Sequence, residues 1–227
     1  MKKTIITILI SLFSYSMASA EVGVNIGVSG NLGVFAAKAH ETVDERQTTG
    51  DEVAAVGYTS IFIEKTLGQY LTLGVDYLPS ALSTDTKEDN KCDLTTAGTG
   101  NSANGVCTAT VNSVKVDFSD MTTIYAALNL NENFYIKAGM ISVDVDTKES
   151  LATGSAYGNK SLDGTMFGAG YNKTLDSGVF FRAEANVMEF DGATFTSTEA
   201  TGVVSANTIK LTQLNGATGK ISIGKSF

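Results

Sequence analysis

The sequence predicts an all-β protein whose strands form one antiparallel, up-and-down barrel, and three observations lead to this prediction. Apolar and polar residues alternate with a period of two in many segments, as in strands that have one apolar face. Short and long connections join these segments in turn. After residue 20, no apolar run approaches the about 20 residues that a membrane-spanning helix needs.

Eight segments carry the alternation. It is clearest from Val22 to Val34, where every second residue is apolar or glycine and the others are small or polar. The predicted strands are residues 22–40, 54–66, 70–86, 108–129, 134–147, 162–174, 179–191 and 207–227. Within 134–145 the apolar residues pass from even to odd positions, which we interpret as a β-bulge near Met140; a misassigned register is the alternative.

The composition argues against several classes of protein. Of the 227 residues, 43% are hydrophobic, 18% are charged, 23 are Gly and 1 is Pro, and the formal net charge is -8. A nucleic-acid-binding surface is basic, so this net charge argues against nucleic acid as a partner. The apolar content argues against disorder, and the single Pro argues against collagen-like or Pro-rich chains.

Residues 1–20 are predicted to be a cleaved secretory signal peptide. Two lysines are followed by an apolar run from Ile5 to Phe13, and Ala18-Ser19-Ala20 provides the small residues of a cleavage site. The apolar run is too short for the alternative, a transmembrane anchor. We therefore expect residues 21–227 to form one exported barrel domain.

The connections indicate the topology. The turns at 67–69, 130–133 and 175–178 are short, whereas the joins at 41–53, 87–107, 148–161 and 192–206 are long and polar. Short turns on one side and long loops on the other are typical of outer-membrane barrels, and an open sheet edge is not tolerated in lipid. We thus expect an eight-stranded transmembrane β-barrel with both termini in the periplasm. Aromatic residues near the short turns predict an inner girdle: Tyr70, Phe134, Tyr135, Phe180, Phe181 and Phe227.

With these patterns, the mature chain resembles the small eight-stranded outer-membrane barrels of Gram-negative bacteria, the OmpA/OmpX-like and OmpW-like group. The most specific element is the C-terminus, where Ile221 and Ile223 alternate toward a terminal Phe227. In that family such a terminus is the signal read by the barrel-assembly machinery; Lys225 departs from the usual apolar residue. The resemblance implies further partners, namely periplasmic chaperones, outer-membrane lipid and lipopolysaccharide.

Few residues suggest site chemistry. Cys92 and Cys107, the only cysteines, lie in the second long loop, and in an exported protein we expect them to form a disulfide. Two free thiols are the alternative, and the lack of a nearby histidine argues against zinc. The sole histidine, His40, lies at the outer end of the first strand without a G-x-S-x-G motif. We expect no catalytic residue, cofactor or metal.

Charged residues on predicted inward faces are the remaining candidates. They are Asp76, Lys115, Asp117, Lys137, Arg182 and Glu184. They could form a charged pore constriction or an ion-pair network that fills the interior. We favour the network, because buried charges need partners and an eight-stranded barrel has a narrow interior.

These observations predict a monomeric, non-enzymatic outer-membrane barrel that acts in envelope integrity or in surface interaction through four long external loops. The sequence identifies no surface ligand. Three alternatives stay open: a narrow, porin-like passive channel for small or apolar solutes, a secreted soluble β-sandwich, and an outer-membrane hydrolase that modifies lipid.

Overall fold

The computed structural model describes residues 23–43, 46–93, 108–151, 156–198 and 207–227. The strands are β1 (Val24–Val43), β2 (Arg46–Leu67), β3 (Leu71–Tyr77), β4 (Leu82–Ser83), β5 (Lys87–Asp93), β6 (Thr108–Asn129), β7 (Phe134–Ser150), β8 (Lys160–Thr174), β9 (Val179–Phe190), β10 (Ala193–Thr196) and β11 (Thr208–Ser226). Among these residues, no helix is long and apolar enough to cross a membrane. The predicted signal peptide lies outside the described residues.

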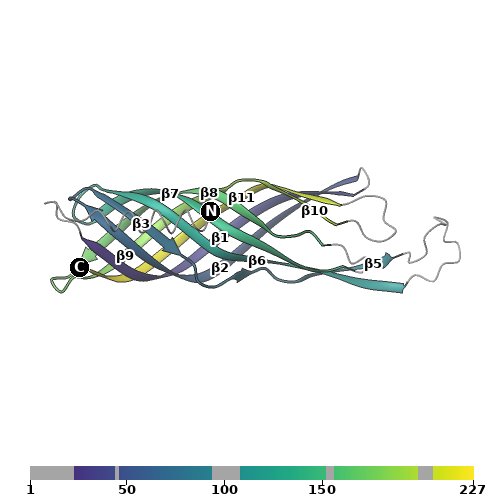
Figure 1. Cartoon of the computed structure of the whole chain (residues 1–227), viewed down its shortest axis with the longest axis horizontal. Helices are drawn as coiled ribbons and strands as arrows, with labels where there is room; N and C mark the ends of the chain where they lie inside the picture. The colour runs from purple at the N-terminus through teal and green to yellow at the C-terminus, as the bar shows by residue number, and fades with distance from the viewer. Residues whose placement is uncertain (1–22, 44–45, 94–107, 152–155, 199–206) are drawn as a thin grey trace.

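The long strands close into a ring of antiparallel neighbours (Figure 1). The ring order is β1, β2, β3, β6, β7, β8, β9 and β11, and β11 pairs back with β1 from Asn25–Ser226 to Thr42–Thr208. Closure pairs the backbone groups of the first and last strands, which would otherwise form an open edge. The predicted eight-stranded, up-and-down barrel is confirmed.

Two predicted strands differ from the structure, and the predicted connection 192–206 contains a further short strand, β10, which pairs with β11. The second predicted strand is longer and begins at Arg46, because its pairing with β1 continues as far as Val43–Arg46. The third is divided: β3 ends at Tyr77, and β4 and β5 then pair with β6. The strand is interrupted at Pro79, because proline has no N–H to donate to a neighbouring strand. The preceding residue still pairs with β6, since the N–H of Leu78 donates to the Met121 carbonyl (2.9 Å).

The part of the ring nearest the short turns has apolar side chains on its outside, and we call it the membrane half; on β1 it runs from Val24 to Val34. The exposed residues are Ile26, Val28, Leu32, Val34, Ile61, Leu71, Leu128, Phe134, Ile136, Met140, Phe167, Tyr171, Phe181, Val187, Ile221 and Ile223. Exposed apolar surface on this scale is typical of a membrane-facing band. Tyr135 and Phe180, expected in the aromatic girdle, instead point inward, with exposures of 6% and 2%.

The rest of each strand, from Phe35 outward on β1, forms the outer half. Its interior holds most of a cluster of apolar side chains: Leu78, Met121, Ile141, Val143, Val145, Tyr157, Leu162, Met166, Phe190, Phe195 and Leu214. Two further members, Tyr58 and Tyr125, extend the cluster into the membrane half. Leu78 and Ile141 are 1% and 2% exposed. The outer half therefore has a hydrophobic core of its own.

The predicted bulge near Met140 is wrong. β7 alternates without interruption, and the register shift lies in β6, where Asp120 and Met121 oppose the single residue Val143. Asp120 has a φ of 53°, which is uncommon for a residue other than glycine. The apolar positions of β7 change parity because they face outward in the membrane half and inward in the outer half.

Candidate functional site

An ion pair between two strands that are not neighbours in the ring crosses the interior of the membrane half. Arg182 on β9 donates from Nη1 and Nη2 to the two carboxylate oxygens of Glu64 on β2, at 2.6 and 2.9 Å. Glu64 also accepts from the Tyr125 hydroxyl (2.7 Å) and from Nδ2 of Asn25 (3.1 Å). Its side chain is 1% exposed, so these four donors replace the water that the carboxylate loses.

Two more ion pairs complete the cluster. Nζ of Lys137 lies 2.7 Å from Oε2 of Glu184, whose other oxygen accepts from the Tyr135 hydroxyl. Lys220 pairs with Asp76. We call these six charged residues, Glu64, Asp76, Lys137, Arg182, Glu184 and Lys220, the lumen cluster. Its three cations and three carboxylates balance in charge, as the interior of a narrow barrel requires.

Aromatic rings enclose Arg182. Its guanidinium carbon lies 5.0 Å from the ring centroid of Phe180 and 5.3 Å from those of Phe62 and Tyr135. These distances allow cation–π attraction. Together the rings and the ion pairs fill the cross-section that a pore would need.

The three rings around Arg182 and the ring of Tyr125 each lie over a glycine of the neighbouring strand. The opposed pairs are Phe62 with Gly27, Tyr125 with Gly74, Tyr135 with Gly170 and Phe180 with Gly224. A Cβ at Gly74 would lie only 2.5 Å from the ring of Tyr125. The glycines therefore leave the space in which the rings lie flat, as aromatic residues do over cross-strand glycines in other sheets.

Beyond the lumen cluster lies a layer of short polar side chains. Ser29 shares a hydrogen bond with Ser222 (2.9 Å), and Asn31 donates to Ser60 (3.2 Å). These residues are 1–8% exposed. Asn31 is opposed to Lys220 on β11 and to Tyr58 on β2, so the ion pairs and the apolar core meet at this layer.

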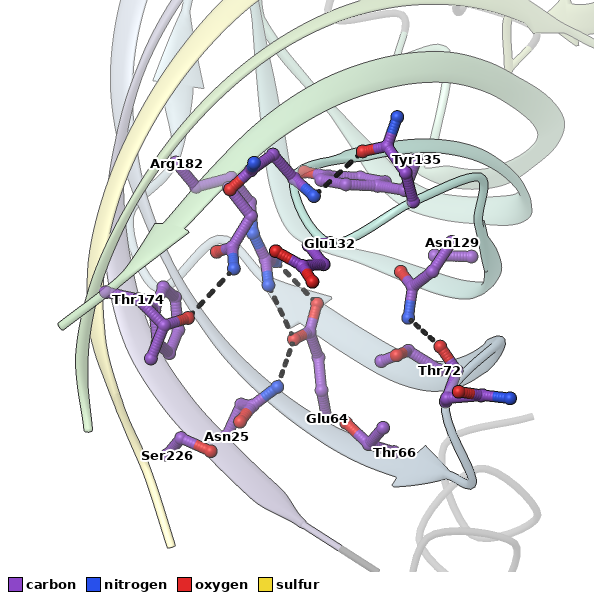
Figure 2. A pocket seen from close by; sticks show the side chains of 16 residues that line it. Asn25, Glu64, Thr66, Thr72, Asn129, Glu132, Tyr135, Thr174, Arg182 and Ser226 are labelled. Carbon is purple, nitrogen blue, oxygen red and sulfur yellow. Dashed lines mark hydrogen bonds and ion pairs between the residues drawn. The ribbon is translucent and has the colours of Figure 1, made fainter. Parts of the chain in front are cut away.

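At the short-turn end, the interior opens into a polar vestibule of about 230 Å³ (Figure 2). Glu64 and Arg182 of the lumen cluster line it, together with Asn172 and Thr174. Asn129 is the last residue of β6 and Gln69 lies in the turn between β2 and β3; Asn129 Nδ2 donates a hydrogen bond to the Gln69 carbonyl (3.2 Å). The vestibule ends at the Glu64–Arg182 pair.

The structure places four of the six predicted charges in the interior: Asp76, Lys137, Arg182 and Glu184. Lys115 and Asp117 are not among them. They pair with each other at 3.5 Å on β6, while their neighbours Val116 and Phe118 pack against the apolar core. The physical reason is the bulge at Asp120, which reverses the faces of β6.

Asp117 lies beyond the membrane half, where it forms polar contacts on the outer surface of the barrel. The Ser83 hydroxyl donates to its carboxylate at 2.6 Å. This hydrogen bond, with a smaller contribution from the Lys115 charge, outweighs partial desolvation and lowers the pKa of the Asp117 carboxyl below its usual value. Asp117 is thus a surface ion-pair residue.

Sequence reasoning missed Glu64 and Lys220. Both lie at alternating positions that could have identified them, since Glu64 follows Tyr58, Ser60 and Phe62 on one face of β2. The apolar residues on both faces of 54–66 concealed this face. Lys220 stands in the predicted last strand between outward Gly219 and Ile221, so its inward position follows from the alternation.

The other predicted residues lie away from the lumen cluster. Nδ1 of His40 is 2.9 Å from Oγ1 of Thr49 on the adjoining strand, at an exposed position of the outer half. Ile221, Ile223 and Phe227 project outward, with exposures of 66%, 47% and 73%. Cys107 lies outside the described residues, so the disulfide with Cys92 stays a prediction.

Comparison with known proteins shows the fold. No protein-family profile matches the chain, and no curated protein sequence matches it. Among solved structures, the outer membrane protein OprG from Pseudomonas aeruginosa is similar over 93% of this chain and 99% of its own, with 9% identity and a TM-score of 0.57. The outer membrane protease OmpT from Escherichia coli covers 94% of this chain and 100% of its own, with 7% identity and a TM-score of 0.46. The similarity to OprG therefore shows that the chain has the fold of that outer-membrane β-barrel.

Proposed function

We propose that this chain is an integral, non-enzymatic protein of a Gram-negative outer membrane that acts through its outer half in envelope integrity or surface interaction. The short turns and both termini face the periplasm, as in other bacterial barrels. One observation carries the proposal: the lumen cluster and the apolar core occupy the interior one after the other. A barrel filled in this way does not serve as an aqueous pore.

The apolar core supports a role at the cell surface. Side chains such as Leu78 and Ile141 are almost fully buried beyond the exposed apolar band, so hydrophobic burial stabilises the strands where no membrane surrounds them. Such a core makes the outer half a stiff platform for the connections it carries. Loops on rigid scaffolds are where binding residues are commonly found.

A deletion strain tests both roles. We expect loss of the protein to increase sensitivity to detergent or to reduce attachment to surfaces, and the wild-type chain to restore what was lost. A second variant joins Ala39 to Gly50 through Asn-Gly, a two-residue turn that suits these opposed positions. It should retain detergent resistance and lose attachment if the role is surface interaction. A deletion strain unchanged in both measurements would contradict the proposal.

The non-enzymatic part of the proposal rests on the surroundings of His40. Its Nδ1 faces a threonine hydroxyl, Thr49, rather than the carboxylate that orients a catalytic histidine in a triad. We expect the purified wild-type protein and His40→Ala to leave lipid and peptide substrates unchanged. Turnover by the wild type that His40→Ala abolishes would overturn this part.

A second candidate function, passage of apolar solutes sideways into the membrane, is favoured by a gap in strand pairing. Among the described residues, positions 46–60 of β2 pair only with β1, whereas β4 and β5 pair only with β6. Tyr58, Leu78 and Leu82 belong to the apolar core beside this gap. An ion pair between Glu52 and Lys87 bridges it.

A cross-link across the gap tests this candidate. Glu52→Cys and Lys87→Cys, in a chain whose Cys92 and Cys107 are replaced by Ser, place a thiol on each side, and a bismaleimide whose linker contains a disulfide can join β2 to β5. If apolar solutes leave through the gap, cross-linking should slow their uptake into cells and reduction of the linker should restore it. Equal uptake before and after cross-linking would exclude the gap as the route.

A further inference from the structure

The outer part of β2, on one side of the gap in strand pairing, is an open sheet edge. Among the described residues, positions 46–60 pair only with β1, so the other side of this strand has no neighbour. Every residue from Gln47 to Ala55 is exposed, on both faces of the sheet. In Figure 1 the outer ends of β1 and β2 lie apart from those of β5 and β6. We call residues 47–55 the β2 edge.

The register identifies the backbone groups that this edge presents. The N–H of Thr66 donates to the Gly23 carbonyl beside β1 (2.8 Å). Because consecutive residues of a strand direct their N–H and C=O groups to opposite sides, the even-numbered residues of β2 bond to β1. The register with β1 is unbroken as far as Val43–Arg46, so the odd-numbered residues direct their backbone groups away from β1. In the β2 edge these residues are Gln47, Thr49, Asp51, Val53 and Ala55.

The opposite side of the gap is protected against pairing, whereas the β2 edge is not. On that opposite side, Pro79 interrupts the strand, β4 has only two residues, and β5 carries Lys87 and Lys91. Proline, short strands and lysines are means by which proteins prevent an edge from pairing with another chain. The β2 edge has no proline, no lysine and no register shift, and its Val53 is 71% exposed. Such an edge accepts a further strand.

The charges at the edge favour a cationic strand. Asp51 and Glu52 belong to the edge, and Glu88 is exposed on β5 across the gap. Two lysines are near them: Lys38 on β1 is opposed to Asp51, and Lys87 on β5 pairs with Glu52. The side chains of Lys87 and Glu52 are both largely exposed, and exposed ion pairs are weak. A lysine of an incoming strand can therefore replace Lys87 beside Glu52.

The partner is an extended segment of another polypeptide. A second copy in the same membrane does not fit, because barrel strands are tilted by about 35–45° and the two β2 strands would cross instead of running side by side. We propose that the β2 edge binds an extended, lysine-containing segment of another protein, which adds as an antiparallel strand and pairs with the backbone of Thr49, Asp51 and Val53. This inference rests on the surface interaction proposed above and specifies the chemistry of its partner.

Amide hydrogen exchange, followed by NMR on the full mature chain in detergent micelles, tests the site. The probe is a short peptide in which lysine and valine alternate. In the free protein, the odd-numbered amides of the β2 edge should exchange faster than the even-numbered ones, which bond to β1. The peptide should slow the odd-numbered amides at least about tenfold. Unchanged exchange of these amides at saturating peptide would overturn the proposal.

Two further peptides separate strand pairing from other modes of binding. In the first, every backbone nitrogen of the lysine–valine peptide is methylated, which removes the N–H donors but keeps the charge. In the second, glutamate replaces lysine. Neither should slow the odd-numbered amides. Equal slowing by the methylated peptide would exclude strand addition, and equal slowing by the glutamate peptide would exclude a preference for cations.

Variants locate the binding. Val53→Pro removes one N–H that points to the incoming strand and keeps the pairing with β1, since proline is tolerated on an edge strand. It should raise the dissociation constant of the lysine–valine peptide at least about tenfold. Val53→Thr is the matched control, because it keeps the N–H and the branched side chain; it should bind as the wild type does.

Folding of each variant is checked by its heat-modifiable migration on a gel. If Val53→Pro does not fold, Thr49→Pro, whose N–H points the same way, decides instead. Wild-type affinity in a folded proline variant would overturn the proposal. In cells, attachment that is lost in the deletion strain but kept with Val53→Pro would overturn the edge as the docking site and leave the surface role intact.

Discussion

The two halves of the barrel differ in the side chains that line their interiors. In the membrane half, charged pairs such as Glu64–Arg182 lie inside and apolar residues face outward. In the outer half, apolar residues such as Ile141 lie inside, and a hydrogen bond from Ser161 to Asp144 (2.6 Å) is exposed outside. The strand β7 passes through both halves without losing its alternation. The surrounding solvent, lipid or water, determines which face of a strand is apolar.

Breaking the lumen cluster should give the largest effect. Glu64→Ala or Arg182→Ala leaves an unpaired buried charge, and we expect a loss of about 3–5 kcal/mol in the free energy of unfolding. Replacing both residues by Met should recover much of this loss, because no unpaired charge is left. Unfolding in urea, followed by circular dichroism, measures these differences.

An exposed pair provides the control for that prediction. Lys87 and Glu52 have side-chain exposures of 68% and 63%, and exposed pairs contribute about 0–1 kcal/mol. Lys87→Ala should therefore change the unfolding free energy by no more than about 1 kcal/mol. A loss from Lys87→Ala equal to that from Arg182→Ala would contradict the account of the cluster.

Shortening a buried apolar side chain in the outer half should lower stability by a different mechanism. We expect Ile141→Ala to cost about 2–5 kcal/mol by leaving a cavity in the apolar core. Limited proteolysis should detect it as faster cleavage beyond the membrane half. Ile136→Ala is the matched control, since Ile136 lies on the same strand but is 46% exposed. Similar proteolysis of the two variants would mean that the outer half has no core of its own.

Replacing a glycine by alanine should destabilise the barrel more beneath an aromatic ring than on the outside. Gly74→Ala places a Cβ against the ring of Tyr125, and overpacking of this kind costs about 1–3 kcal/mol. Gly30→Ala meets nothing within 4 Å and should have little effect. Thermal unfolding of the two variants measures the difference; a Gly74→Ala protein as stable as the Gly30→Ala protein would show that the ring is not fixed there.

The smallest effect is expected at the outer surface. Because the Ser83 hydroxyl lowers the pKa of Asp117, this carboxylate stabilises the fold above its unfolded-state pKa, and the contribution disappears as the pH falls through the folded-state pKa. Ser83→Ala should raise the pKa of Asp117 in an NMR titration and change the unfolding free energy by about 0.5 kcal/mol or less. An unchanged pKa of Asp117 in this variant would show that the Ser83 hydroxyl does not lower it.

Alternation along the sequence was sufficient to predict the barrel, its strand number and most strand positions. The period of two places Arg182 and Glu184 on one face regardless of the rest of the chain. The same reasoning failed for Lys115 and Asp117, because an added residue in β6 reverses the faces and leaves little trace in the local pattern.

The site was less predictable than the fold. The partner of Arg182 is Glu64, which is 118 positions away in sequence. Only closure of the ring through β1 and β11 brings their strands around one interior. The parity change in 134–145 was correctly observed but attributed to a bulge. Its cause is the change of surroundings along β7, which a local pattern does not identify.

Ion conductance tests the central claim, that the lumen cluster and the apolar core block the interior, most directly. Folded wild-type protein, verified by its heat-modifiable migration, is inserted into a planar lipid bilayer between salt solutions. The lumen cluster and the apolar core predict no single-channel current steps. Stable, reproducible steps from the folded protein would contradict the account.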